Sequence, residues 1–145
     1  MDMARDKYTN KVPLKPGARE FLVWLRQQGI RTGIASSNGI ELVETVLKAQ
    51  GIQEYLESVH TCCEVPKGKP APDIYLLVAE TLGVKPEECL VFEDVPMGIL
   101  AGKNAGMRVC AVEDTFSASQ REEKKELADY YIESYDEIPR ERMQP

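Results

Sequence analysis

The chain has 145 residues, enough for one ordinary domain with a core of its own and too few for two. Its 24 acidic residues outnumber its 18 lysines and arginines, and the net charge of -6 argues against nucleic acid as a partner. No apolar run approaches the roughly 18 residues of a membrane-spanning helix, and no secretory leader follows Met1. The four cysteines form no Cys-x-x-Cys pair, which is typical of a reduced compartment. We therefore expect a cytoplasmic protein with a single domain, residues 1–145, that binds no membrane.

Helices and strands are predicted to alternate along the chain. The clearest helix is 73–82, where apolar residues recur at helical spacing and Gly83 supplies the stop. The continuous apolar run 89–92 predicts a strand that is covered on both faces. Ser119 and Glu122 form a capping-box pattern that opens a polar helix. The predicted helices are 18–28, 38–50, 73–82, 95–105 and 119–128, and the predicted strands are 31–35, 58–62, 89–92, 107–112 and 130–132.

This alternation predicts an α/β fold: a doubly wound, Rossmann-like parallel sheet with helices on both faces. Helix 95–105 carries small residues on one face, which predicts close packing. These residues are Gly98, Ala101, Gly102 and Ala105. The active site of such a sheet lies beyond the carboxyl ends of its strands. Three strand-to-helix junctions therefore become candidate site segments.

The first junction is Ser36-Ser37-Asn38-Gly39, which follows strand 31–35. A hydroxyl at a strand end, followed by the free amides of a helix N-terminus, makes a small anion cradle. The same residue types are also favoured as ordinary helix caps. Both interpretations stay open at this point.

The second junction runs from Lys67 to Asp73. Pro70 forces Lys69 into an extended conformation, so its ammonium can reach over the edge of the sheet and neutralise a phosphate oxygen. The alternative is a solvated loop with two lysines. We interpret Lys67 in that second way.

The third junction is Glu93-Asp94, directly after the buried strand. Two carboxylates at such a place are costly unless a cation compensates them. Magnesium is a natural candidate, because it binds one or two carboxylates together with water and a phosphate. The alternative is that Asp94 simply caps the following helix.

A short segment holds another possible group of metal ligands, namely His60, Cys62, Cys63 and Glu64. Metal sites of this type draw a second pair of ligands from elsewhere in the chain. No second pair is evident here, and we interpret the segment as a strand end with buried thiols.

Three segments together carry a resemblance to a known family. They are 34–38 (Ile-Ala-Ser-Ser-Asn), 68–75 (Gly-Lys-Pro-Ala-Pro-Asp-Ile-Tyr) and 91–99 (Val-Phe-Glu-Asp-Val-Pro-Met-Gly-Ile). Over residues 14–138 the chain resembles the haloacid dehalogenase superfamily, and within it the β-phosphoglucomutase-like phosphatases. The resemblance implies a phosphatase or phosphoryl-transfer hydrolase that depends on Mg²⁺ and acts on a small phosphorylated metabolite through an aspartyl-phosphate.

The resemblance also implies roles for individual residues. Ser36 resembles the hydroxyl that binds the transferring phosphoryl group, and Ser37 and Asn38 would add contacts beside it. Lys69 resembles the lysine that balances charge on the nucleophile and the phosphate. Glu93 and Asp94 match the acidic pair that holds magnesium, with Asp94 as the direct ligand.

The decisive family motif is missing from this chain. Family members begin with a strand that ends in Asp-x-Asp, which supplies the nucleophile and the general acid/base. None of the seven aspartates here is followed two residues later by another, and no helical cap domain is present. We therefore expect an incomplete core without its first central strand, which belongs between the strands ending at Ser36 and Phe92. Unpaired edges would remain inside the sheet, to be filled by the polar residues 1–10, by strand exchange with another chain or by a missing amino-terminal segment.

Two alternatives remain beside an enzyme whose isolated chain is inactive. One is a noncatalytic remnant that binds a phosphorylated ligand or a partner protein. The other is a receiver-like signalling domain, which also combines acidic residues with a lysine. A receiver-like domain has its acidic cluster early and its lysine late. Here Lys69 precedes Glu93 and Asp94, which argues against it.

Overall fold

The computed structural model describes residues 17–36, 41, 44–45, 47–48, 51, 53–113 and 119–138. Its helices are α2 (Ala18–Gln27), α4 (Asp73–Leu82), α5 (Pro96–Asn104) and α6 (Arg121–Leu127). Its strands are β1 (Gly33–Ser36), β2 (Ser58–Thr61), β3 (Leu90–Glu93), β4 (Arg108–Val112) and β5 (Tyr130–Ile132). Short 3-10 turns are η2 (Gln53–Tyr55), η3 (Cys62–Glu64), η4 (Pro86–Glu88) and η6 (Tyr135–Glu137). The predicted alternation of helix and strand is confirmed.

Local sequence signals placed most of these elements to within two residues. Gly83 ends α4 with a left-handed φ of 72°, a conformation that glycine adopts without strain. The predicted helix 38–50 is helical at 41, 44–45 and 47–48, and its other residues lie outside the described part of the chain. The capping box at Ser119 is wrong: α6 starts two residues later with Gln120 as its N-cap, so Glu122 comes one position too early for a capping box.

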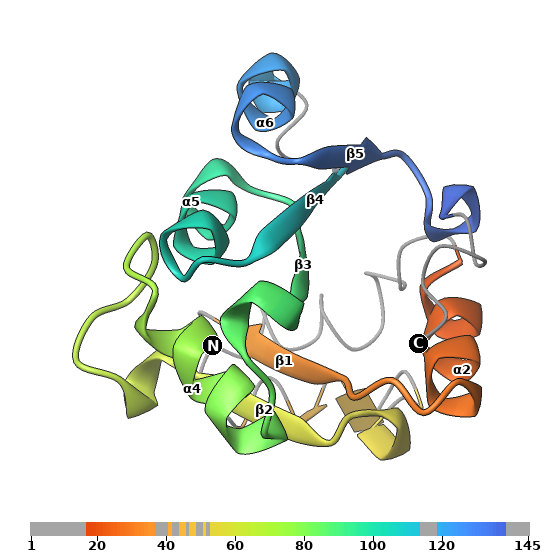
Figure 1. Cartoon of the computed structure of the whole chain (residues 1–145). Coiled ribbons are helices and arrows are strands. Elements are labelled where there is room, and N and C mark those ends of the chain that lie inside the picture. The colour runs from red at the N-terminus through yellow and green to blue at the C-terminus, as the bar shows by residue number, and fades with distance from the viewer. Residues whose placement is uncertain are drawn as a thin grey trace.

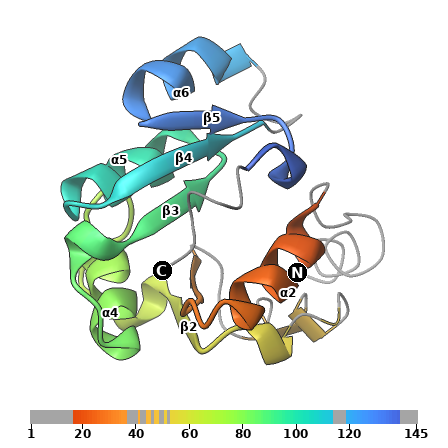
Figure 2. The ribbon, with the colours of Figure 1, turned by 45° about the vertical axis from the view of Figure 1, so that its right-hand side comes forward.

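The strands form two parallel sheets (Figures 1 and 2). In one, β1 pairs with β2, with Ala35 opposite His60. In the other, the order is β3-β4-β5, and Phe92 lies opposite Cys110. Within the described residues no strand pairing joins β1 to β3, which are the facing strands of the two sheets. This is the place where a central strand was expected to be missing.

Helices cover both faces of the larger sheet, as predicted (Figure 1). On one face, α4 and α5 bury a cluster that includes Ile74, Ile99 and Val109. On the other, α2 places Phe21 and Leu25 against β4 and β5. The predicted close packing of α5 holds at Gly102, where a Cβ atom would come within 2.6 Å of the Val109 side chain. None of the helices in the described part of the chain is long and apolar enough to cross a membrane.

Candidate functional site

Lys69 joins the carboxyl ends of the two sheets. Its Nζ donates to the backbone oxygen of Ala35 in β1 over 3.1 Å and to Oε2 of Glu93 in β3 over 2.8 Å. The side chains of Lys69 and Glu93 are each only 10% exposed. Lys69 therefore reaches over the sheet edge as its sequence context predicted, whereas Lys67 is exposed. The ammonium bridges two strands that do not pair with each other.

The Glu93 carboxylate is surrounded by protein groups. Its Oε2 also accepts a hydrogen bond from the Tyr75 hydroxyl, and its Oε1 accepts one from the Asp94 amide over 3.2 Å. Its other side lies against the first turn of α5, where a Cβ atom on Gly98 would overlap the carboxylate. The cation that compensates Glu93 in this structure is thus Lys69, and Gly98 provides the space for this arrangement.

Asp94 borders a small cavity just beyond the end of β3. The cavity has a volume of about 140 Å³ and is lined by Phe92, Glu93, Asp94, Val112 and Tyr135. Burial, and then the charges of Cys110, Asp94 and Glu93, raise the pKa of Tyr135 well above its usual range. The Tyr135 phenol therefore stays protonated and is not a base at neutral pH.

The residues at the end of β3 fit a magnesium ion. Mg²⁺ binds hard oxygen ligands and needs only one or two protein carboxylates, with water and phosphate oxygens completing its octahedron. Asp94 borders the cavity, and its carboxylate is the group that would hold the ion. Within the described residues there is no cluster of three or more metal-binding side chains. One or two carboxylates would suit an ion that also binds phosphate oxygens of a substrate, whereas a closed structural site needs more protein ligands.

The serine-rich junction is only partly described. Ser36 is the last residue of β1 and directly follows Ala35, whose carbonyl binds Lys69. Ser37 and Asn38 lie outside the described residues. The structure thus brings Lys69, Glu93 and Asp94 together near the end of the strand that carries Ser36.

His60 and Glu64 pair with protein groups. The His60 imidazole lies 3.0 Å from Glu64 Oε1 through Nδ1 and 2.9 Å from Thr81 Oγ1 through Nε2. Both ring nitrogens therefore have protein partners and are occupied. The expected buried thiols are wrong for Cys63, which is exposed because β2 ends at Thr61 and Cys63 lies in η3 beyond the sheet. The Cys62 side chain is outside the described part of the chain.

Sequence reasoning missed three residues that shape the site: Tyr75, Gly98 and Tyr135. Tyr75 ends the motif segment 68–75 but was given no role from the sequence; in the structure its side chain is buried, with 7% exposed. Gly98 was recognised as part of a small-residue face, but its neighbour is the Glu93 carboxylate. No local signal marked Tyr135, which reaches the cavity from η6 near the end of the chain.

Comparison with known proteins identifies the family of this chain. Residues 4–106 match the haloacid dehalogenase-like hydrolases, and the chain belongs to that family. The predicted family membership is confirmed, and a β-phosphoglucomutase-like structure from Thermotoga maritima is similar to the chain, with a TM-score of 0.80 and 28% identity over 90% of this chain and 61% of that one. Hexitol phosphatase B of Escherichia coli K12 is 32% identical over 126 residues, which are 87% of this chain and 56% of the relative. The chain spans about half the length of the curated relatives it matches.

Two further solved structures show the same fold. CbbY from Rhodobacter sphaeroides, as the D10N mutant in complex with xylulose-(1,5)bisphosphate, matches with a TM-score of 0.81 and 28% identity, over 94% of this chain and 64% of that one. A family hydrolase from Deinococcus radiodurans with bound phosphate and sodium matches with a TM-score of 0.74 and 30% identity, over 83% and 55%.

Proposed function

We propose that this chain carries the phosphate- and magnesium-binding part of a phosphohydrolase that acts on a small phosphorylated metabolite. The observation that carries the proposal is the Lys69 ammonium, which is almost fully buried and held where β1 and β3 end. Relatives named as hexitol phosphatases support the substrate class. The structure with bound phosphate supports it as well.

Lys69 keeps capacity for a phosphate oxygen. An ammonium group has three N–H donors, and the hydrogen bonds of Lys69 within the described residues go to Ala35 and Glu93. A third N–H can therefore bind a phosphate oxygen while the other two keep the side chain in place. Ser36, Ser37 and Asn38 would contact the same phosphate from the end of β1.

Asp94 would hold the magnesium ion, with Glu93 beside it. When bound, the ion neutralises negative charge on the phosphoryl group. The residues of this chain would position the phosphate and neutralise part of its negative charge. Lys69 binds one oxygen as a fixed point charge, and the low exposure around Glu93 keeps water away from that pair.

The nucleophile that would form the aspartyl-phosphate is not among the residues of this chain, because no Asp-x-Asp occurs in it. We therefore expect the 145-residue chain alone to bind phosphate and Mg²⁺ and to show negligible turnover. The edges of β1 and β3 pair with no strand in the described part of the chain, and they would accept the strand that brings the motif, from an amino-terminal segment or by strand exchange.

The test is to assay a phosphate monoester with purified chain, alone and together with an amino-terminal family segment that ends in Asp-x-Asp. Activity that appears only in the mixture, and is lost on Asp94→Ala, supports the proposal. Mg²⁺-dependent turnover by the chain alone that is lost on Asp94→Ala would refute the expected inactivity. Assembly with the segment without any activity would favour a noncatalytic phosphate-binding protein.

A further inference from the structure

Tyr75 contacts both members of the Lys69–Glu93 pair. Its hydroxyl donates to Glu93 Oε2, the same oxygen that accepts from Lys69 Nζ over 2.8 Å. Its ring centroid lies 5.1 Å from Lys69 Nζ, within the range of a cation–π interaction. The side chain is buried at the start of α4, so the hydroxyl reaches the carboxylate from inside the core.

We propose that the Tyr75 hydroxyl is a positioning group that limits how strongly Glu93 neutralises Lys69 and thereby sets the affinity of the site for phosphate. This inference rests on the proposed function, in which Lys69 binds a phosphate oxygen. Tyr75 acts through Glu93 and does not itself touch the phosphate.

The reason is competition for one ammonium group. Glu93 and a phosphate are both anionic acceptors for Lys69, so a stronger Lys69–Glu93 interaction leaves less attraction for the phosphate. An oxygen that already accepts a second hydrogen bond presents less negative charge to Lys69. By sharing Oε2, the Tyr75 hydroxyl weakens the pair without breaking it.

The surroundings of Glu93 keep its carboxylate in this position. The Asp94 amide holds Oε1, and the backbone of α5 at Gly98 closes the other side. The carboxylate is therefore not free to turn and offer Lys69 its second oxygen. The strength of the Lys69–Glu93 interaction then depends on how Oε2 is shared between its two donors, the Lys69 ammonium and the Tyr75 hydroxyl.

The Tyr75→Phe variant removes the hydroxyl and keeps the ring beneath Lys69. We expect inorganic phosphate to bind this variant about threefold more weakly than the unaltered chain, as measured by calorimetric titration, the change expected from an ordinary hydrogen bond. Glu93→Gln removes the competing charge, so phosphate should bind it several-fold more tightly. In the Glu93→Gln background, Tyr75→Phe should have little effect.

Tyr131 supplies a matched control. Its hydroxyl, on β5, donates over 2.6 Å to Oε2 of Glu113, the residue after β4, and this second tyrosine–glutamate pair has no hydrogen bond to Lys69 or Glu93 within the described residues. Tyr131→Phe should leave phosphate affinity unchanged. A merely structural contribution of Tyr75 would instead weaken phosphate binding equally in the unaltered chain and in the Glu93→Gln background.

A second measurement does not depend on phosphate. The coupling between Lys69→Met and Glu93→Gln is obtained from urea unfolding of the four chains of a double-mutant cycle. The cycle is then repeated with Tyr75→Phe in all four chains. The coupling, expressed as a ratio of unfolding constants, should be about threefold larger there, which is the change expected from one ordinary hydrogen bond.

The outcomes separate the two proposals. If the unaltered chain binds no phosphate, the proposed function fails, while the coupling cycle still tests Tyr75. A coupling that is unchanged or reduced by Tyr75→Phe overturns the role proposed for Tyr75. The same conclusion follows if Tyr75→Phe binds phosphate as tightly as the unaltered chain, or loses equal affinity with and without Glu93→Gln.

Discussion

A methyl group at Gly98 is expected to disturb the site from the opposite side of Glu93. In Gly98→Ala the new Cβ would overlap Cγ, Cδ and Oε2 of Glu93. A flexible, exposed glutamate would move aside at little cost. This one is held by Lys69, by Tyr75 and by the Asp94 amide, so its displacement breaks hydrogen bonds.

The magnitude follows from these contacts. Hydrogen bonds to charged groups contribute about 1.5–3 kcal/mol each, and the displaced carboxylate loses those to Lys69 and Tyr75 at least in part. Replacing glycine by alanine in a helix gains at most about 1 kcal/mol. We expect a net loss of about 2 kcal/mol in the free energy of unfolding. With a urea m-value of about 2 kcal/mol/M, the unfolding midpoint falls by about 1 M.

The assay is urea unfolding followed by circular dichroism. The matched background is Lys69→Met with Glu93→Ala, which removes the overlapping atoms and leaves no uncompensated buried charge. In that background Gly98→Ala should be neutral or slightly stabilising. A loss of equal size in both backgrounds, or a gain in the unaltered chain, would show that Glu93 is not what Gly98 accommodates.

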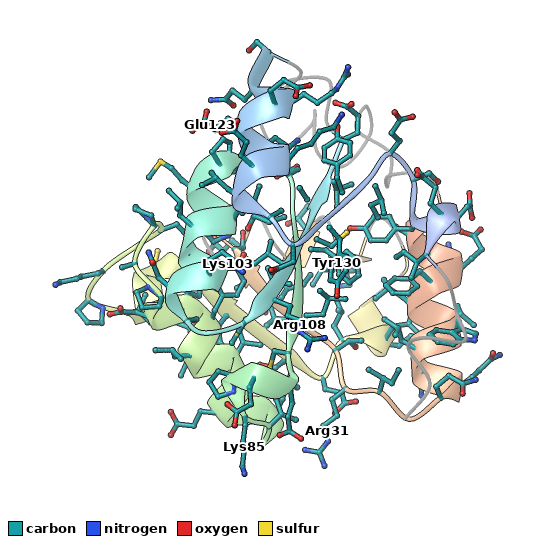
Figure 3. All side chains as sticks on the ribbon, turned by 45° about the horizontal axis from the view of Figure 1, so that its top comes forward. Arg31, Lys85, Lys103, Arg108, Glu123 and Tyr130 are labelled. Carbon is teal, nitrogen blue, oxygen red and sulfur yellow. The ribbon has the colours of Figure 1, made fainter. Side chains whose placement is uncertain are left out.

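Three further predictions concern the rest of the fold. The ammonium of Lys103, a residue of α5 that is labelled in Figure 3, lowers the pKa of Asp129. The Asp129 carboxylate therefore stabilises the fold above its ordinary pKa, and that stabilisation is lost as the pH falls through the lowered value. Unfolding at a series of pH values should show a shallower acid limb for Asp129→Asn, and an unchanged limb would contradict the pairing. Burial raises the pKa of Cys110 to about 12, whereas Cys63 is exposed. Because the thiolate is the form that reacts, brief alkylation at about pH 8 followed by mass spectrometry should find label at Cys63 and none at Cys110. Lys124 is fully buried and donates to a backbone oxygen over 2.7 Å. Lys124→Ala should therefore lower the free energy of unfolding, measured in urea, by about 2 kcal/mol or more. A change within about 0.5 kcal/mol, the usual range for a surface site, would argue against its burial.

Local sequence patterns were sufficient to predict the bounds of several helices and strands. Helix α4 spans the predicted residues because its apolar spacing and Gly83 both act within the segment itself. Strand β5 was likewise predicted with its observed bounds. Lys124 shows the limit of such patterns: the charged sequence of α6 predicted a polar helix, yet this lysine is completely buried. Its aliphatic chain packs inside because the ammonium finds a backbone acceptor in β4.

The sequence by itself determined the order of helices and strands, the family and which polar residues follow the strand ends. It could do so because helix stops, apolar runs and motif residues are local, and because parallel strands bring their carboxyl ends to one edge. Only the tertiary structure decided which groups pair there. Lys69 and Glu93 are 24 residues apart, and Tyr75 and Gly98 join them from two different helices. The gap between β1 and β3 was expected from the motifs, but only the structure shows that Lys69 spans it, because that contact depends on where the loop before α4 places the side chain.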